Sequence, residues 1–182
     1  MKTDEELVTA ALEGSTPAFA ELVQRYQQRL LRFLLTRCAT RADAEDALQD
    51  TFLNAYRYLA SYRPQWRFST WLYRIAMRNA ARKRGGETLP YTDCPDESAD
   101  PLAACMRDSE RDNAWQAAGR LLTPEAQSAL WLRYVEDLPI REVARALGRS
   151  QAWTKVTLMR SRRRLQSALA DAAAPGESKA YG

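Results

Sequence analysis

The sequence predicts an all-α protein with two small helical domains joined by a flexible acidic linker, the C-terminal one a helix-turn-helix. Three observations support this fold class. Hydrophobic residues recur every three to four positions, capping residues precede these periodic segments, and no stretch shows convincing strand alternation. We expect domains at 1–84 and 113–170, an acidic linker at 85–112 and a disordered tail at 171–182.

The composition argues against an enzyme and against a membrane protein. The 182 residues include no histidine, which removes the usual general base and most catalytic zinc sites. Three cysteines without a C-x-x-C pair indicate neither a disulfide framework nor a zinc ribbon. No uncharged apolar run is long enough to span a bilayer, and acids stand where a signal peptide carries basic residues. We expect a cytoplasmic protein with no catalytic residue, no metal, no cofactor and no membrane insertion.

Two helices are expected before residue 40. Thr3 and Glu6 form a capping box for a short first helix. Thr16 is placed as the N-cap of a second helix, with Pro17 in its first position, and the hydrophobic periodicity then continues to about Cys38.

A third helix is expected after Thr40, which can cap it. Its predicted buried stripe consists of Leu48, Phe52, Ala55 and Leu59. A neighbouring face, available to a partner, consists of Asp46, Gln49, Asp50 and Leu53. A capped, solvated helix end is the alternative for these acids, because the helix dipole favours acidic residues near an N-terminus.

The segment 63–84 is strongly basic and rich in aromatic residues. It has seven basic residues and no acid, a net charge of +7, interleaved with Trp66, Phe68, Trp71 and Tyr73. Basic groups bind phosphate and flat rings stack on bases, so this composition is typical of single-stranded nucleic-acid binding. A fourth helix beginning at Ser69 or Thr70 would place three arginines on one stripe: Arg74, Arg78 and Arg82. About half of the aromatic residues are expected simply to pack the core.

The run DAEDALQDTFLNAY followed by FSTWLYRIA resembles the second conserved region of bacterial sigma factors, in the extracytoplasmic-function (ECF) group of the sigma-70 family. The resemblance implies that Asp46, Gln49 and Asp50, with Leu53 on the same face, dock on the clamp helices of core RNA polymerase. It also implies that the next loop and helix open the minus-ten promoter element and hold flipped-out bases of the non-template strand. The positions concerned are Tyr62, Arg63, Trp66, Arg67, Phe68, Ser69, Thr70, Trp71, Arg74 and Arg78. Arg78 stands where the family often has Asn, so that residue's role is not transferred to Asn79.

The segment 85–112 has eight acids against two arginines, a net charge of −6, and three prolines. This composition is typical of a solvated tether. The resemblance implies a path through the polymerase cleft, and shielding of the basic segments in the absence of DNA is a further hypothesis.

Helical spacing resumes before residue 115, and Thr123 with Pro124 restarts a helix. Another helix begins at Pro139, Gly148 supplies a left-handed turn residue, and Ser150 caps the last helix. Two helices joined by a short glycine-containing turn predict a helix-turn-helix.

The segment 141–170 has eight basic residues against one acid, a net charge of +7, which favours duplex DNA as the ligand. A recognition helix presents its N-terminal side chains to the major groove. The candidates are Arg149, Ser150, Gln151, Trp153, Lys155 and Arg160, with Thr154, Leu158 and Leu165 turned inward. A solvated helix end is the alternative for the arginines at 160–164.

The run LTPEAQSALWLRYVEDLPIREVARALGRS resembles the fourth region of the same sigma group, which reads the minus-thirty-five element. The resemblance implies an ECF sigma factor whose partners are core RNA polymerase, promoter DNA (duplex and non-template single strand) and an anti-sigma factor.

Two other functions are compatible with parts of the sequence. A dimeric helix-turn-helix regulator that is no polymerase subunit would explain residues 124–170, but not the acidic face or the basic-aromatic segment. A nucleic-acid-processing enzyme would need clustered metal-binding carboxylates, whereas the acids of the third helix spread around it.

Overall fold

The computed structural model describes residues 2–83, 115 and 118–173. Over this part of the chain all regular structure is helical, which confirms the predicted fold class. The elements are α1 (Asp4–Leu12), α2 (Thr16–Leu35), α3 (Arg41–Arg57), η1 (Leu59–Ser61), α4 (Phe68–Lys83), α6 (Pro124–Tyr134), α7 (Ile140–Leu147) and α8 (Gln151–Ala173). A helical turn at 118–121 precedes α6. The expected acidic linker and residues 174–182 of the expected tail lie outside the described residues, whereas α8 continues past the predicted boundary at 170.

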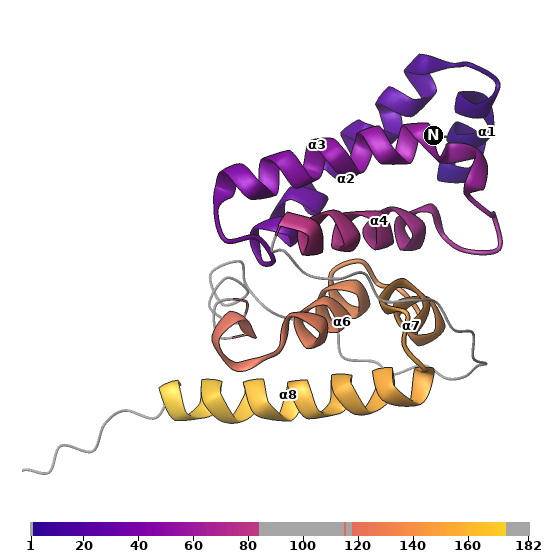
Figure 1. The fold of residues 1–182 in the computed structure, drawn as a ribbon. Coiled ribbons are helices and arrows are strands. Elements are labelled where there is room, and N and C mark those ends of the chain that lie inside the picture. Colours follow the sequence, from indigo (N-terminus) through magenta and orange to yellow (C-terminus); the bar gives the residue numbers. More distant parts are fainter. Residues whose placement is uncertain (1, 84–114, 116–117, 174–182) are drawn as a thin grey trace, which may run out of the picture.

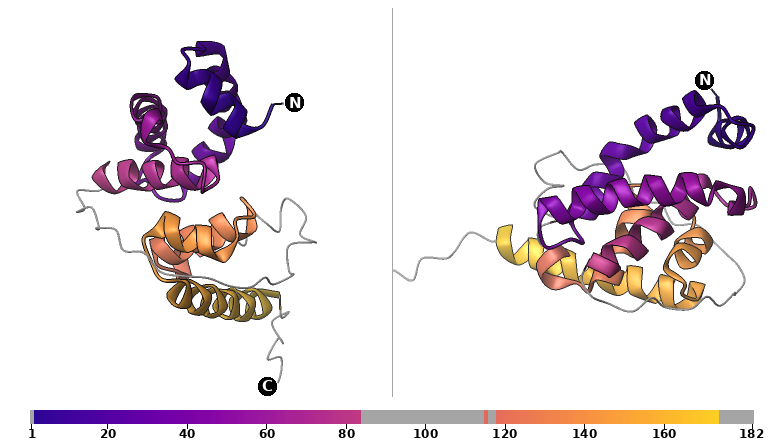
Figure 2. Two further views of the ribbon diagram at one scale, coloured as in Figure 1. Left: turned by 90° about the vertical axis from the view of Figure 1, so that its right-hand side faces the viewer. Right: turned by 45° about the horizontal axis from the view of Figure 1, so that its top comes forward.

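The helices are arranged in layers. Figure 1 shows α3 above α4, then α6 and α7, with α8 on the far side of these two. In the contacts, α4 packs on α3 and α7, while α8 packs on α6 and α7. We call residues 2–83 the N-terminal half and residues 118–173 the C-terminal half. The views in Figure 2 show the two halves facing each other across α4 on one side and α6 and α7 on the other.

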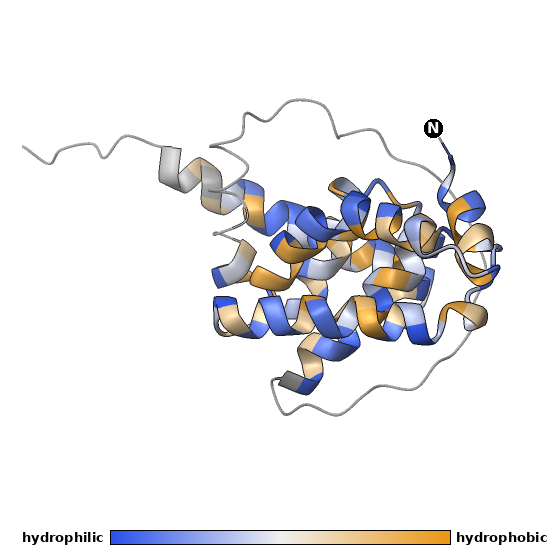
Figure 3. Ribbon diagram, turned by 90° about the horizontal axis from the view of Figure 1, so that it is seen from above, coloured by the Kyte–Doolittle hydropathy of each residue, from blue (hydrophilic) through white to orange (hydrophobic). Residues whose placement is uncertain are grey.

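One hydrophobic core includes residues of both halves. The ring of Phe33 in α2 lies 5.1 Å from the ring of Tyr73 in α4 and 5.9 Å from that of Trp131 in α6. All three residues are buried. Figure 3 shows hydrophobic and hydrophilic residues alternating along the helices, as expected for helices that bury one face. The halves are therefore joined by apolar packing as well as by polar contacts.

Local capping explains where the first three helices begin. The capping box of Thr3 and Glu6 is present, with backbone-to-side-chain hydrogen bonds of 2.7 and 3.2 Å. The expected cap of α2 is wrong by one residue: Ser15 accepts from the Ala18 N–H at 3.4 Å, because Thr16 already belongs to the first helical turn. The hydroxyl of Thr40 caps α3 as predicted, accepting from the Asp43 N–H at 3.1 Å.

The buried stripe of α3 differs from the prediction. Ala55 and Leu59 are buried as predicted, but Leu48 and Phe52 are only partly buried. In their place the helix buries Ala44, Ala47 and Thr51. These smaller side chains allow α3 to lie close to both α2 and α4, with the larger ones at the margins of the contact. The side-chain amide of Asn79 in α4 donates to the Thr51 hydroxyl at 3.2 Å and completes the seam.

The helix-turn-helix forms as predicted. Gly148 adopts a φ of 65°, the left-handed conformation that glycine tolerates best. The Ser150 hydroxyl accepts from the Trp153 N–H at 3.1 Å and caps α8. Thr154 and Leu158 are buried, as expected, and Leu165 is partly buried. None of the helices among the described residues combines the length and apolar character that crossing a bilayer requires.

Candidate functional site

The predicted partner face of α3 is exposed. Asp46, Gln49, Asp50 and Leu53 all lie on the surface, and the Leu53 side chain is 65% exposed. Tyr56, three positions after Leu53, extends this face, and the sequence analysis did not include it. Its ring makes an edge contact with Phe19 at 5.0 Å, which holds it in place while it stays exposed. We call these five residues the docking face.

Two aromatic residues predicted to bind minus-ten DNA are part of the core. Tyr62 and Phe68 are buried and their rings lie 5.7 Å apart. The Tyr62 hydroxyl donates to the Trp66 carbonyl at 2.7 Å and fixes the loop before α4. Burial raises the pKa of Tyr62 to about 12. In this conformation these two side chains shape the loop instead of presenting ring faces to a base.

The residues around the start of α4 contact the C-terminal half. The Thr70 hydroxyl donates to the Glu142 carboxylate, which also accepts from the Arg67 N–H at 3.1 Å. Both Thr70 and its neighbour Ser69 are buried. The Arg145 guanidinium lies over the Trp66 ring, 3.9 Å from its centroid. The fold therefore gathers these predicted DNA-binding residues and covers several of them.

The basic stripe of α4 remains accessible. Arg63, Arg67 and Arg78 are exposed, whereas Trp71 and Arg74 are partly exposed. Arg82 is also exposed, so the predicted stripe of Arg74, Arg78 and Arg82 lies along α4, whereas Arg63 and Arg67 precede the helix. Together these arginines give a cationic surface with one partly exposed indole, that of Trp71.

The six residues predicted to contact DNA from the recognition helix differ in their exposure to solvent. Ser150, Lys155 and Arg160 are exposed. Arg149 and Trp153 are partly buried, the Arg149 guanidinium lying 5.3 Å from the Trp153 ring and 2.8 Å from the Glu125 carboxylate. Gln151 is only 7% exposed.

Apolar residues on the outer face of α8 were missed by the sequence analysis. Val156 is 41% and Met159 is 45% exposed, and Ala152, one turn earlier, is also on the surface. Their spacing of four and three residues places them on one side of the helix, beside Lys155 and Arg160. Counting this spacing from the cap at Ser150 would have identified them.

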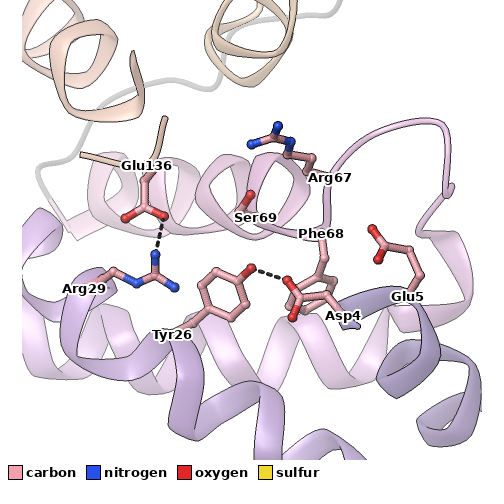
Figure 4. Close-up of a pocket in the computed structure, with 8 residues that line it drawn as sticks. All are labelled: Asp4, Glu5, Tyr26, Arg29, Arg67, Phe68, Ser69 and Glu136. Carbon is pink, nitrogen blue, oxygen red and sulfur yellow. Dashed lines mark hydrogen bonds and ion pairs between the residues drawn. The ribbon is translucent and has the colours of Figure 1, made fainter. Parts of the chain in front are cut away.

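A cavity of about 330 Å³ is lined by residues of the N-terminal half and, on one side, by Glu136 of the C-terminal half (Figure 4). Two of its contacts are intramolecular pairs: the Tyr26 hydroxyl donates to Asp4, and Arg29 lies 3.5 Å from Glu136. Burial, and then the hydrogen bond to Asp4, raise the pKa of Tyr26. Acids and arginines both line the cavity, so it favours no single charge of ligand.

Both halves match models of known protein families. Residues 22–86 match sigma-70 region 2, and residues 113–165 match sigma-70 region 4. The first range contains the docking face and α4, and the second contains α7, the turn and the first part of α8.

The chain is also similar to whole proteins. It is 32% identical to the ECF RNA polymerase sigma factor SigM of Mycobacterium tuberculosis, over 90% of this chain and 83% of the relative. It is 29% identical to the ECF RNA polymerase sigma-E factor of Haemophilus influenzae, over 91% and 94%. Among solved structures, CnrH in complex with the cytosolic domain of CnrY is similar, with a TM-score of 0.69, 25% identity and coverage of 94% of this chain and 99% of that one. The fold is also shared with the sigma factor RpoE of Bartonella quintana, solved with the anti-sigma factor NepR, at a TM-score of 0.60, 20% identity and coverage of 84% and 96%.

Proposed function

The chain belongs to the ECF group of RNA polymerase sigma factors, and from this membership we propose how its residues divide the work of transcription initiation. The protein is a polymerase-associated sigma factor that binds promoter DNA. The alternative, a dimeric helix-turn-helix regulator, is not favoured, because the family match extends through the N-terminal half and not only through the helix-turn-helix.

The docking face of α3 binds core polymerase in this proposal. The observation that carries it is that the four predicted residues, Asp46, Gln49, Asp50 and Leu53, are exposed together on one helix. Exposed carboxylates beside an exposed leucine suit a partner with basic groups beside an apolar contact. Tyr56 enlarges the apolar part of this face.

The loop and the first turns of α4 open the minus-ten element. Opening DNA costs about 1.4 kcal/mol per base-pair step, and stacking a base on an aromatic ring returns roughly 1–3 kcal/mol. Trp66 and Trp71 are the candidates for this stacking, because they are partly exposed while Tyr62 and Phe68 are buried. One or two captured bases can start the opening, and polymerase supplies the rest.

The outer face of α8 reads the minus-thirty-five element. Arg149, Ser150, Lys155 and Arg160 supply polar contacts to bases and phosphates in this proposal. Val156 and Met159 add apolar contacts of the kind that thymine methyl groups accept. Gln151 and Trp153 support the helix from the inner side.

The protein acts without catalysis, as sigma factors do, and works in the cytoplasm, where RNA polymerase is. Because CnrH and RpoE were each solved with a protein bound, one of them a named anti-sigma factor, we propose that an anti-sigma factor also controls this chain.

The test is transcription from a pool of promoter fragments by core polymerase with and without this protein, with 2-aminopurine fluorescence to report opening. New start sites should require the protein, and Asp46→Ala combined with Gln49→Ala should abolish them. Glu45→Ala is the matched control, since this acid is exposed on the same helix but pairs with Arg41 at 2.7 Å. Start sites that do not depend on the protein would refute the proposed function.

A further inference from the structure

Glu142 of α7 occupies the positively polarised start of α4. Its side chain is 5% exposed and accepts from the Arg67 N–H at 3.1 Å and from the Thr70 hydroxyl. The Arg67 guanidinium is nearby, with Nε 3.8 Å from the carboxylate. Proteins bind DNA phosphates with the same kinds of donor: backbone N–H groups at a helix start, hydroxyls and guanidinium groups. The carboxylate therefore takes the place of an external anion.

Two further contacts extend this cover along the same surface. Glu136, in the turn after α6, has a side chain only 2% exposed; it accepts from the Tyr73 hydroxyl at 2.7 Å and pairs with Arg29. The guanidinium of Arg145 in α7 lies over the Trp66 ring and occupies one of its faces. Phosphate donors and a ring face for stacking are thus covered by one element of the C-terminal half, the stretch from the end of α6 through α7.

We propose that the free protein blocks part of its own minus-ten surface: Glu142, Glu136 and Arg145 hold the C-terminal half against Arg67, Thr70, Tyr73 and Trp66. A non-template strand can reach the Arg67 N–H, the Thr70 hydroxyl and the covered face of Trp66 only after this contact opens. This inference rests on the proposed function, in which the loop and α4 bind that strand. We call this arrangement the closed contact.

The carboxylates of the closed contact and a DNA phosphate exclude each other for a physical reason. Each carboxylate is buried and uses donors of the N-terminal half, so a phosphate cannot reach the same donors without displacing it. A ligand that binds only the open form has its apparent affinity reduced by the fraction of open molecules. The recognition helix is outside the closed contact, because Lys155, Val156 and Arg160 remain exposed. The block therefore acts on single-strand capture and not on duplex reading.

The test replaces both acids, as Glu136→Gln with Glu142→Gln, and measures binding of the free protein to a single-stranded minus-ten oligonucleotide by fluorescence anisotropy. Charge-assisted hydrogen bonds of this kind shift an equilibrium by about tenfold to a hundredfold, so affinity should rise by that factor. Small-angle X-ray scattering should show a larger radius of gyration for the variant. Affinity for a minus-thirty-five duplex should change no more than in the control.

The matched control is Glu21→Gln with Glu45→Gln, which removes the same charge from two acids that pair within single helices of the N-terminal half. Tyr73→Phe provides a second variant, since it removes only the hydroxyl donated to Glu136 and should give a smaller gain in affinity. Equal single-strand affinity and equal radius of gyration in both double variants, with native circular dichroism, would overturn the closed contact. Failure of the proposed function would be seen separately, as no promoter opening by the wild-type chain with core polymerase.

Discussion

The two DNA-binding surfaces of this sigma factor differ in how far they are available. In the C-terminal half, the outer face of α8 is exposed over three turns, with Lys155, Val156 and Arg160 on the surface. In the N-terminal half, Thr70 and Tyr73 are buried and are bonded to acids of the other half. The surface that reads an intact duplex is ready for use, whereas the surface that captures separated bases is covered at the start of α4 and open only farther along the helix, at Arg74 and Arg78.

This difference follows from the chemistry of the two tasks. A duplex reader needs polar groups and small apolar groups on a rigid helix, and these are stable in water. A strand-opening surface needs aromatic rings, which are unfavourable to leave in water, and hydrogen-bond donors, which need a partner wherever packing removes them from water. Packing the start of α4 against Glu142 and Glu136 satisfies these donors within the chain.

The largest expected effect concerns the shared core. Phe33→Ala removes the ring between Tyr73 and Trp131 and should lower the free energy of unfolding by about 3–5 kcal/mol. Denaturant unfolding followed by circular dichroism measures it. Leu35→Ala, on the same helix but exposed, is the control and should change stability by no more than about 0.5 kcal/mol. Similar losses in the two variants would show that the halves do not share a core.

The next expected effect is a loss of folding stability at high pH that arises from tyrosines of the N-terminal half. Burial raises the pKa of Tyr26, Tyr62 and Tyr73, all in the N-terminal half, and for Tyr62 the pKa is about 12. An unfolded tyrosine has a pKa near 10, so between about pH 10 and pH 12 the unfolded chain loses this proton while the folded chain keeps it. Stability is therefore fully present below pH 10 and falls above it. Tyr62 alone should account for about 1 kcal/mol between pH 10 and pH 11.

Denaturant unfolding at pH 9, 10 and 11, with tyrosinate absorbance at 295 nm, tests this pH dependence. Tyr62→Phe should reduce the loss, and Tyr58→Phe, at an exposed position, should not. The same pH dependence in all three proteins would contradict the assignment to Tyr62.

A smaller effect concerns the turn that positions the recognition helix. Gly148→Ala should cost about 1 kcal/mol, because φ is 65° and the added Cβ meets no atom within 4 Å, so that only backbone strain acts. Gly119→Ala, a helical site with equal space, should instead stabilise by up to about 1 kcal/mol. Thermal unfolding of the two variants measures both, and changes of the same sign would argue against a strained turn.

The smallest expected effect concerns the contact between the outer face of α8 and thymine methyl groups of the minus-thirty-five element. Replacing single thymines of the preferred minus-thirty-five element by deoxyuridine removes one methyl group each. If Val156 contacts such a methyl, one replacement should weaken wild-type binding by about fourfold. The same replacement should have no effect on Val156→Ala, while Val135→Ala, exposed outside α8, should behave as wild type. An undiminished loss in Val156→Ala would exclude this contact.

The sequence by itself determined the local structure and the family. Capping residues and apolar periodicity act within a few residues, so the starts of α1 and α3 and the turn at Gly148 could be predicted from Thr3, Thr40 and the glycine itself. Four of the five residues of the docking face, all except Tyr56, could be predicted for the same reason, since residues at helical spacing on one helix stay together whatever else packs nearby.

Only the tertiary structure decided which residues face solvent. The burial of Tyr62 and Phe68, the small-residue seam of α3 and the inward position of Gln151 depend on neighbours far away in the sequence. Glu142 is the clearest case: as the one acid in a basic segment it gave no local signal, and its role arises because α7 packs against the start of α4. Charge patterns along a chain describe what each segment can bind, whereas packing between segments decides what is already bound within the molecule.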